Sequence, residues 1–156
     1  MSLFKKDAIF KSQQNTKDKV FNEIAEKLSV KGYVKDSFLE NINERELNYP
    51  TGMDMTVLEN NIPNVAIPHT EAEHVNDTLV VPVKLQETVQ FNNMIKPDET
   101  LDVSYLFMIL NNKANEQANI LSLIMDFLNK NESEELKYFF ELDNTDEIYD
   151  YLVKNF

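Results

Sequence analysis

The stretch Leu101–Leu110, LDVSYLFMIL, contains the longest apolar run of the chain. Its β-branched and aromatic residues predict a strand. Two further short runs have the same character, Asn64–Pro68 (NVAIP) and Thr78–Lys84 (TLVVPVK), and polar loops such as FNNMIKPDET separate the runs. A β-sheet is therefore predicted in the middle of the chain. Pro82 cannot donate to a sheet ladder, which predicts that its strand lies at an edge or carries a bulge.

Amphipathic helices are predicted on both sides of these strands. The first helix has an apolar stripe and ends near Gly32, a common residue after a helix C-terminus; the stripe consists of Val20, Phe21, Ile24, Ala25 and Leu28. Ser37 with Glu40 three residues later matches the capping box, which predicts a second helix up to about Asn48. A third helix is predicted after the strands from the stripe Ile120, Leu121, Ile124, Met125 and Leu128.

Smaller segments complete the pattern. Residues 3–10 (LFKKDAIF) alternate loosely and predict a first strand, followed by a loop over residues 11–16. Residues 49–52 (YPTG) suit a type I turn. Shorter helices are predicted from about Ser133 and Thr145. Because the order is helices, strands and again helices, without a repeat or a linker, we expect residues 1–156 to form a single α/β domain.

The composition excludes several classes of partner and cofactor. With 15 basic and 27 acidic residues the net charge is −12, which disfavours nucleic acid and anionic membranes. The longest apolar run is about a third of a membrane span, and the N-terminal residues lack the apolar core of a signal peptide, so we expect a cytoplasmic protein. The only glycines, Gly32 and Gly52, are too few for a P-loop or a Rossmann fingerprint, and no cofactor is expected.

The chain contains no cysteine. A thiol nucleophile, a thiolate metal site and a disulfide framework are therefore excluded within this sequence. Any cysteine that takes part in its mechanism has to belong to a partner.

Arg45 is the only arginine of the sequence. Its spacing from Phe38, Ile42 and Tyr49 places all four residues on one face of the second predicted helix. In one interpretation Arg45 lies at the edge of the core or pairs with a nearby glutamate. In the other, its planar fork of donors binds a phosphate or a carboxylate, which lysine does less well. Sequence position alone leaves both interpretations open.

Both histidines of the chain lie in residues 64–75, NVAIPHTEAEHV. His69 follows a short apolar run ending in proline, where a buried strand emerges from a sheet, and such strand ends bind ligands in open α/β sheets. An isolated histidine is usually a structural or exposed side chain. A neutral imidazole near pH 7 is also a nucleophile that needs no separate base, which makes His69 a catalytic candidate.

A metal site is the competing interpretation of the same segment. His69, Glu71, Glu73 and His74 are all possible ligands. However, the histidines are five residues apart in a segment that begins with a proline, whereas the H-E-x-x-H motif places them four apart on a helix. We therefore expect no metal.

These residues together resemble a known family. The segment ERE at a helix end, then PTG, and then VAIPH is similar to the mannitol/fructose-type IIA proteins of the sugar phosphotransferase system, and the resemblance runs from about Thr16 through nearly the whole chain. It implies an α/β fold with a mixed sheet flanked by helices. AIPHTEAEH resembles the galactitol-type IIA most. Mannitol and fructose types commonly have a glycine where Thr70 follows His69, and a second histidine where Gln117 stands, and both departures favour the galactitol branch.

The resemblance implies roles for particular residues and partners. His69 would accept a phosphoryl group from HPr and pass it to a cysteine of a IIB component, which serves a membrane IIC component; the sugar would be galactitol or a related compound. Arg45 matches the active-site arginine of the family. Residues that would shape the site or bind the phosphoryl group are Thr51, Gly52, Thr70, His74 and Gln117.

The resemblance also leaves a functional alternative. Nitrogen-type members of the same fold act as regulatory modules, in which the phosphorylation state of the residue matching His69 controls partner binding. A metal-binding or purely structural acidic domain is a third possibility with little support in the sequence.

Overall fold

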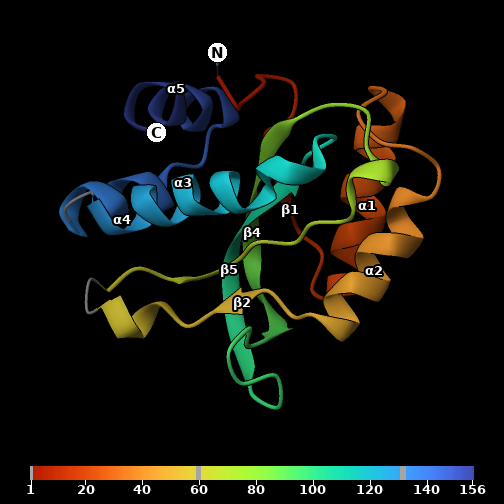
Figure 1. Cartoon of the computed structure of the whole chain (residues 1–156). Helices are drawn as coiled ribbons and strands as arrows, with labels where there is room; N and C mark the ends of the chain where they lie inside the picture. The colour runs from red at the N-terminus through yellow and green to blue at the C-terminus, as the bar shows by residue number, and fades with distance from the viewer. Residues whose placement is uncertain (1, 59–60, 131–132) are drawn as a thin grey trace.

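The computed structural model describes residues 2–58, 61–130 and 133–156. In this part of the chain, five strands form one sheet in the order β1-β4-β5-β3-β2 (Figure 1). The strands are β1 (Phe10–Ser12), β2 (Gly52–Met53), β3 (Asn64–Ala66), β4 (Leu79–Asn92) and β5 (Thr100–Leu110). β4 and β5 form a long antiparallel hairpin, β1 is parallel to β4, β3 is parallel to β5, and β2 is antiparallel to β3. The predicted mixed sheet is confirmed.

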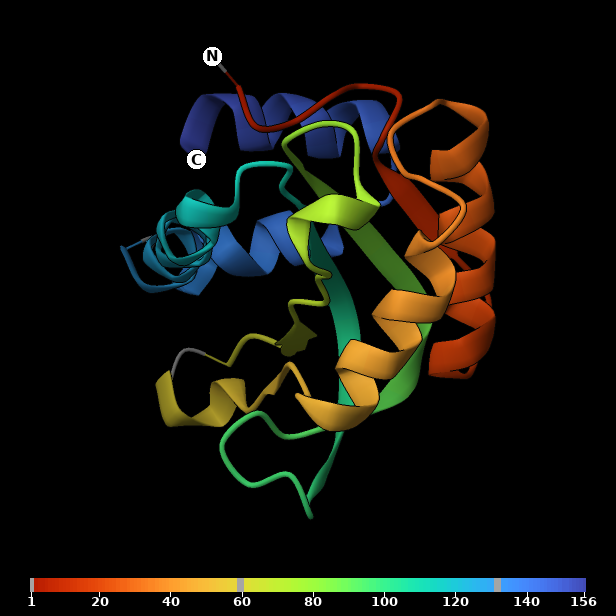
Figure 2. The same cartoon turned by 45° about the vertical axis from the view of Figure 1, so that its right-hand side comes forward.

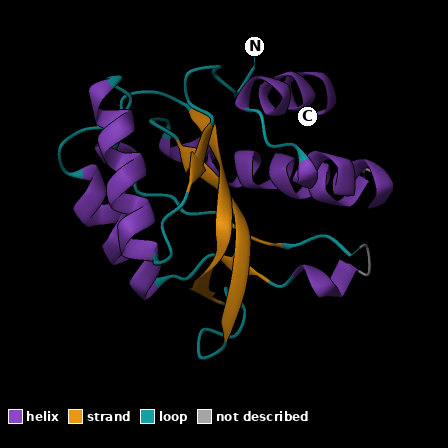
Figure 3. Cartoon of the chain, turned by 180° about the vertical axis from the view of Figure 1, so that it is seen from behind, coloured by secondary structure: helices purple, strands orange, loops and turns teal. Residues whose placement is uncertain are grey.

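Helices cover both faces of this sheet, as Figures 1 and 3 show from opposite sides. One face carries α1 (Lys17–Val30) and α2 (Phe38–Asn48); the other carries α3 (Gln117–Lys130), α4 (Ser133–Glu141) and α5 (Thr145–Asn155). Three short 3-10 helices lie in the connections: η1 (Met55–Leu58), η2 (Ala72–His74) and η3 (Ala114–Glu116). The result is one domain of three layers.

The sheet has a buried core on each face because successive side chains of β5 point in opposite directions. Leu106, Met108 and Leu110 pack with residues of α1 and α2. Tyr105, Phe107 and Ile109 pack with residues of α3, α4 and α5. Burial on both sides explains why this strand reads as a continuous apolar run.

The predicted first two helices are confirmed, but the proposed cap of the second is wrong. The stripe of α1 is buried, and Gly32 follows the helix with a φ of 80°, a conformation that glycine adopts easily. α2 ends at Asn48 as expected. Ser37 makes no side-chain cap bond, because its hydroxyl hydrogen-bonds to Nδ1 of His74 at 2.7 Å.

The predicted first strand over residues 3–10 is also wrong. The strand covers only Phe10–Ser12, where a loop was expected. A turn closed by a bond from the Ala8 amide to the Lys5 carbonyl interrupts the segment, and Phe4 before this turn packs into the core beside α5. The loose alternation of apolar and polar residues therefore arises because apolar residues before and after a turn are buried, and not because the segment is one strand.

The predicted type I turn over residues 49–52 does not form, because the chain bends only at Tyr49 and Gly52 already begins β2. The Thr51 amide donates to the carboxylate of Glu46 at 2.7 Å. Gly52 is required for a different reason than a turn: a Cβ atom at this position would lie 2.6 Å from the Asn92 carbonyl oxygen. The close approach of β2 to the end of β4 thus depends on glycine.

Pro82 lies within β4, which is not an edge strand, and the register shift of this strand falls between Lys84 and Val89. The edge alternative is therefore wrong, whereas the predicted irregularity is present in this strand, after the proline rather than at it. The Val80 amide points away from β5 and donates to the Leu3 carbonyl, so the Pro82 nitrogen, two residues later, faces the same side. Pairing with β1 begins only at Val83, and no ladder bond is lost.

Candidate active site

His69 lies just beyond the end of β3, in a segment that is fixed from both sides. On one side the Ile67 amide donates to the Thr51 carbonyl at 3.3 Å. On the other side the Ile109 amide donates to the Pro68 carbonyl at 3.0 Å, and His69 pairs with Ile109 of β5. Pro68 also restricts the backbone of the residue before it. The direction in which the chain leaves the sheet is therefore well defined.

A backbone bond selects the tautomer of the His69 ring. Nδ1 lies 2.9 Å from the Ile67 carbonyl oxygen. A carbonyl oxygen only accepts, so Nδ1 carries the proton and the neutral ring has its lone pair on Nε2. Burial lowers the pKa of His69, and the positive charge of Arg45 acts in the same direction, while the Ile67 bond and Glu71 oppose them. The ring is thus neutral near pH 7, with an unprotonated nitrogen at Nε2.

Arg45 lies in the last turn of α2. Its guanidinium carbon is 4.8 Å from the ring centre of Tyr49, which is largely exposed, and its Nη1 lies 3.4 Å from Oε1 of Glu71. Its Nε is buried without a hydrogen-bond partner among the described residues. The pair with Glu71 agrees with the first interpretation from the sequence. Phosphate binding by Arg45 stays a prediction.

Glu71 connects this arginine to the second histidine. Its other carboxylate oxygen lies 4.0 Å from Nε2 of His74, which is also 3.8 Å from Glu73. The Lys35 amide donates to the His74 carbonyl, which holds η2 beside the N-terminal part of α2, as Figure 2 shows. His74 therefore connects η2 to the segment around the start of α2, and among the described residues no hydrogen bond joins it to the ring of His69.

These side chains do not form a metal site in the described structure. No group of three His, Asp or Glu residues among the described residues is arranged to hold a metal ion. Glu71 directs one oxygen towards Arg45 and the other towards His74, and the Nδ1 of each histidine is occupied by a hydrogen bond.

Thr70 and Gln117 occupy different surroundings. Thr70 is buried, and its hydroxyl donates to the Glu71 carbonyl at 3.0 Å. Gln117 is the first residue of α3, and its Oε1 accepts a weak bond from Asn111 at 3.5 Å. The Nε2 of Gln117 is buried and has no hydrogen-bond partner among the described residues. Asn111 follows Ile109 by two residues at the end of β5, so Gln117 lies near the strand end that pairs with His69.

Thr51 and Gly52 reach the site through their backbone. The Thr51 side chain is buried, and its hydroxyl donates to Glu46 at 2.7 Å, while its carbonyl binds Ile67. The sequence interpretation missed Glu46 and Asn111, and it named Glu71 only as a possible metal ligand and not as the partner of Arg45. A signal for Glu46 was present in the sequence, because Glu46 follows Ile42 by four residues and so lies on the buried face of α2. Asn111 gave a weaker signal, as a polar residue directly after a buried strand.

Within the described residues, no helix is sufficiently long and apolar to cross a membrane. The search of curated proteins found no match to the sequence. The family model described as phosphoenolpyruvate-dependent sugar phosphotransferase system, EIIA 2, matches residues 2–155.

Solved structures share the fold. The crystal structure of IIA mannitol from Escherichia coli has a TM-score of 0.71 and 21% identity, covering 96% of this chain and 98% of that chain. The complex of enzyme IIAMTL and phosphorylated enzyme IIBMTL from Escherichia coli gives a TM-score of 0.72 and 20% identity, covering 97% of each chain. The crystal structure of the nitrogen regulatory protein IIA-Ntr from Neisseria meningitidis has a TM-score of 0.62 and 19% identity, covering 95% of this chain and 94% of that chain. Because the family model spans nearly the whole sequence, the chain belongs to the EIIA 2 family of the phosphoenolpyruvate-dependent sugar phosphotransferase system.

Proposed function

We propose that His69 is the phosphoryl-carrying residue of this EIIA domain, which accepts the group from phosphorylated HPr and transfers it to a cysteine of a IIB component. The observation that carries the proposal is the bond between Nδ1 of His69 and the Ile67 carbonyl, which leaves Nε2 as the nucleophile. The absence of cysteine in the chain is consistent with an acceptor thiol on a partner.

The chemistry needs no proton transfer at His69. The lone pair of Nε2 attacks the phosphorus of the HPr phosphohistidine, and the N–P bond on HPr breaks with its electron pair returning to the HPr ring. The Nδ1 proton stays in place, so the phosphorylated His69 ring carries positive charge that the Ile67 carbonyl stabilises. A IIB thiolate then attacks phosphorus, the Nε2–P bond breaks, and the original tautomer returns.

Arg45 supplies positive charge in this scheme. A phosphoryl group in transfer spreads negative charge over its equatorial oxygens, and a guanidinium near them stabilises the transition state. The Arg45 side chain is 30% exposed, and its Nε has no hydrogen-bond partner among the described residues, which supports this role. The buried Nε2 of Gln117 is a second candidate donor, while Thr70 and His74 shape the loop that follows His69, and Thr51 and Gly52 shape the segment before it.

The wider assignment follows from this role. We infer one IIA domain over residues 1–156, located in the cytoplasm, that binds HPr and IIB as soluble partners and meets the membrane IIC component only indirectly, without nucleic acid or a cofactor. The sequence AIPHTEAEH favours galactitol or a related sugar alcohol as the transported compound. Transfer from the phosphorylated protein to galactitol-type IIB, compared with mannitol-type IIB, tests this choice.

The decisive experiment uses intact mass spectrometry after incubation with phosphoenolpyruvate, Enzyme I and HPr. Wild type and His74→Ala should each gain one acid-labile phosphoryl adduct, and His69→Ala should gain none. His74→Ala is a matched control because these are the only histidines of the chain. An adduct on His69→Ala, or no adduct on wild type with Enzyme I and HPr active on another IIA, would refute the proposal.

The regulatory alternative shares the first step and differs in the second. A carrier loses its phosphoryl group rapidly when a cognate IIB is added. A regulatory module keeps the group in the presence of IIB, and its phosphorylation changes its affinity for a different partner protein. The rate of loss on addition of IIB therefore separates the two functions.

A further inference from the structure

Glu46 is a buried acidic residue that the proposed chemistry does not use. It follows Arg45 directly on α2, and only 4% of the residue is exposed. Its two carboxylate oxygens accept bonds from the Thr51 amide and the Thr51 hydroxyl, each at 2.7 Å. None of the ion pairs seen within the described ranges includes Glu46. Burial raises the pKa of Glu46, and the Thr51 bonds oppose this rise. Burying a carboxylate costs free energy unless hydrogen bonds to its oxygens compensate for the lost water. The two bonds from Thr51 therefore matter for keeping Glu46 in this position.

The bonds of Glu46 continue to the His69 ring through the backbone. Thr51, held by Glu46 through its amide and hydroxyl, accepts the Ile67 amide on its carbonyl at 3.3 Å. The Ile67 carbonyl in turn accepts the Nδ1 proton of His69 at 2.9 Å. Three consecutive links therefore join a side chain of α2 to the group that selects the tautomer of the histidine.

The same side chain also relates the two principal site residues to each other. Arg45 is the neighbour of Glu46 on the helix, whereas His69 belongs to the segment after β3. Apolar packing of α2, through residues such as Ile42, is not directional and permits small displacements. A buried carboxylate that accepts two hydrogen bonds is held in a fixed geometry, and losing either bond costs free energy because the oxygen is then left without a partner. Glu46 thus links α2, through Thr51, to the segment after β3 that contains His69.

We propose that Glu46 is a positioning residue that, through Thr51 and Ile67, holds the Nδ1-protonated tautomer of His69 and its alignment with Arg45. The part that concerns phosphoryl transfer rests on the proposed function. The part that concerns the tautomer does not, because it applies to the unphosphorylated protein.

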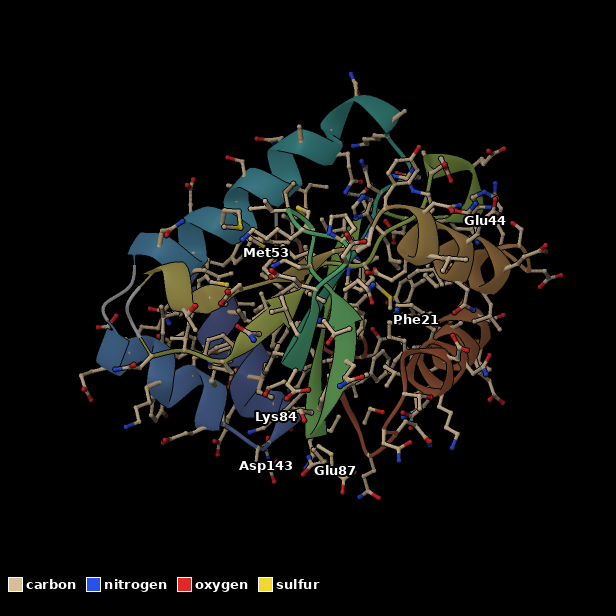
Figure 4. The ribbon with its side chains drawn as sticks, turned by 90° about the horizontal axis from the view of Figure 1, so that it is seen from below. Phe21, Glu44, Met53, Lys84, Glu87 and Asp143 are labelled. Atoms are coloured by element: carbon tan, nitrogen blue, oxygen red, sulfur yellow. The ribbon has the colours of Figure 1, made fainter. Side chains whose placement is uncertain are left out.

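The variants follow from the bond geometry. Glu46→Ala removes both acceptors. Glu46→Gln keeps the pair, because its amide oxygen accepts the Thr51 amide and its NH₂ donates to the Thr51 hydroxyl oxygen. Thr51→Val removes only the hydroxyl, and Thr51→Ser restores it. Glu44→Ala is the matched control, since Glu44 lies on the same helix and is exposed (Figure 4).

The first measurement is long-range ¹H–¹⁵N NMR of the His69 ring in the unphosphorylated proteins. Wild type, Glu44→Ala and Glu46→Gln should show Nδ1 protonated and Nε2 unprotonated. Glu46→Ala should show a mixture of the two tautomers, and Thr51→Val a smaller admixture that Thr51→Ser removes. The second measurement is the rate of phosphoryl transfer from HPr, which should fall about a hundredfold in Glu46→Ala, as a displaced nucleophile predicts.

The outcomes distinguish the possibilities. A folded Glu46→Ala whose His69 shifts and transfer rate equal those of Glu44→Ala would overturn the proposal. If Glu46→Ala does not fold, the comparison of Thr51→Val with Thr51→Ser takes its place. Equal His69 ring shifts in these two variants would overturn the proposal. If wild type accepts no phosphoryl group, the proposed function fails, while the tautomer comparison still tests Glu46.

Discussion

The core between the sheet and helices α3, α4 and α5 differs in chemistry from the site around His69. In the core, rings pack against one another, with centroid distances of 5.4 Å between Phe127 and Phe139 and 5.2 Å between Tyr105 and Phe107. At the site, single directional bonds such as the 2.9 Å contact of His69 set the geometry. The core distributes its energy over many weak contacts, so changes there should affect stability. The site depends on few contacts, so changes there should affect rates.

The largest effect is expected in the aromatic core. Phe139→Ala removes a fully buried ring that contacts several other aromatic rings and should lower the free energy of unfolding by about 3–5 kcal/mol. Urea denaturation measures this, with Tyr138→Ala, an exposed neighbour, as the control. The folded variant should keep the wild-type transfer rate. A slower rate at unchanged stability would contradict the proposed division between core and site.

The next effect concerns rate. Arg45→Ala should slow phosphoryl transfer from HPr by about 10²–10³-fold, as the loss of one charge-stabilising donor does in other enzymes. Arg45→Lys should lose less, because it keeps the charge but not the planar fork. Rapid-quench kinetics measures both variants. Equal rates in both variants and wild type would mean that the arginine is structural.

Within the core, one polar group breaks the pattern and gives a smaller effect. The hydroxyl of Tyr105 is buried and has no hydrogen-bond partner among the described residues, and burial raises its pKa. Tyr105→Phe keeps the ring and removes the unpaired hydroxyl, so the free energy of unfolding should rise by about 1 kcal/mol. A loss of stability in urea denaturation would indicate a bound water or another partner for the hydroxyl.

The smallest effect is the titration of His69. Its pKa is lowered below the ordinary value of about 6.5, so NMR titration should find it neutral throughout the neutral range. Glu71→Gln should lower this pKa further, because Glu71 favours the charged ring, and Arg45→Gln should raise it. In the unfolded chain His69 has its ordinary pKa, and in the folded protein its pKa is lower. As the pH falls from the first pKa to the second, the unfolded chain binds a proton that the folded protein does not, so the free energy of unfolding decreases through this range. Shifts in the opposite directions would contradict the electrostatic description.

The periodicity of the sequence predicted the elements that are governed by burial. The stripe of α1 and the apolar run of β5 fall where expected, because the core selects side chains at the period of the element that carries them. Two local predictions failed because one side chain had two possible partners. Ser37 matched a helix cap but binds His74, and Thr51 suited a turn but binds Glu46.

The sequence by itself determined the α/β class, the family and the two candidate residues Arg45 and His69, because these depend on residue identity and local spacing. Only the tertiary structure decided which nitrogen of the His69 ring carries the proton and which acidic residues lie around the site. Thr51 and Ile67, which share a backbone hydrogen bond, are 16 positions apart in the sequence, and Arg45 and Glu71 are 26 apart. Spacing along the chain carries no information on such contacts, because their geometry exists only once α2, β2 and β3 have packed together.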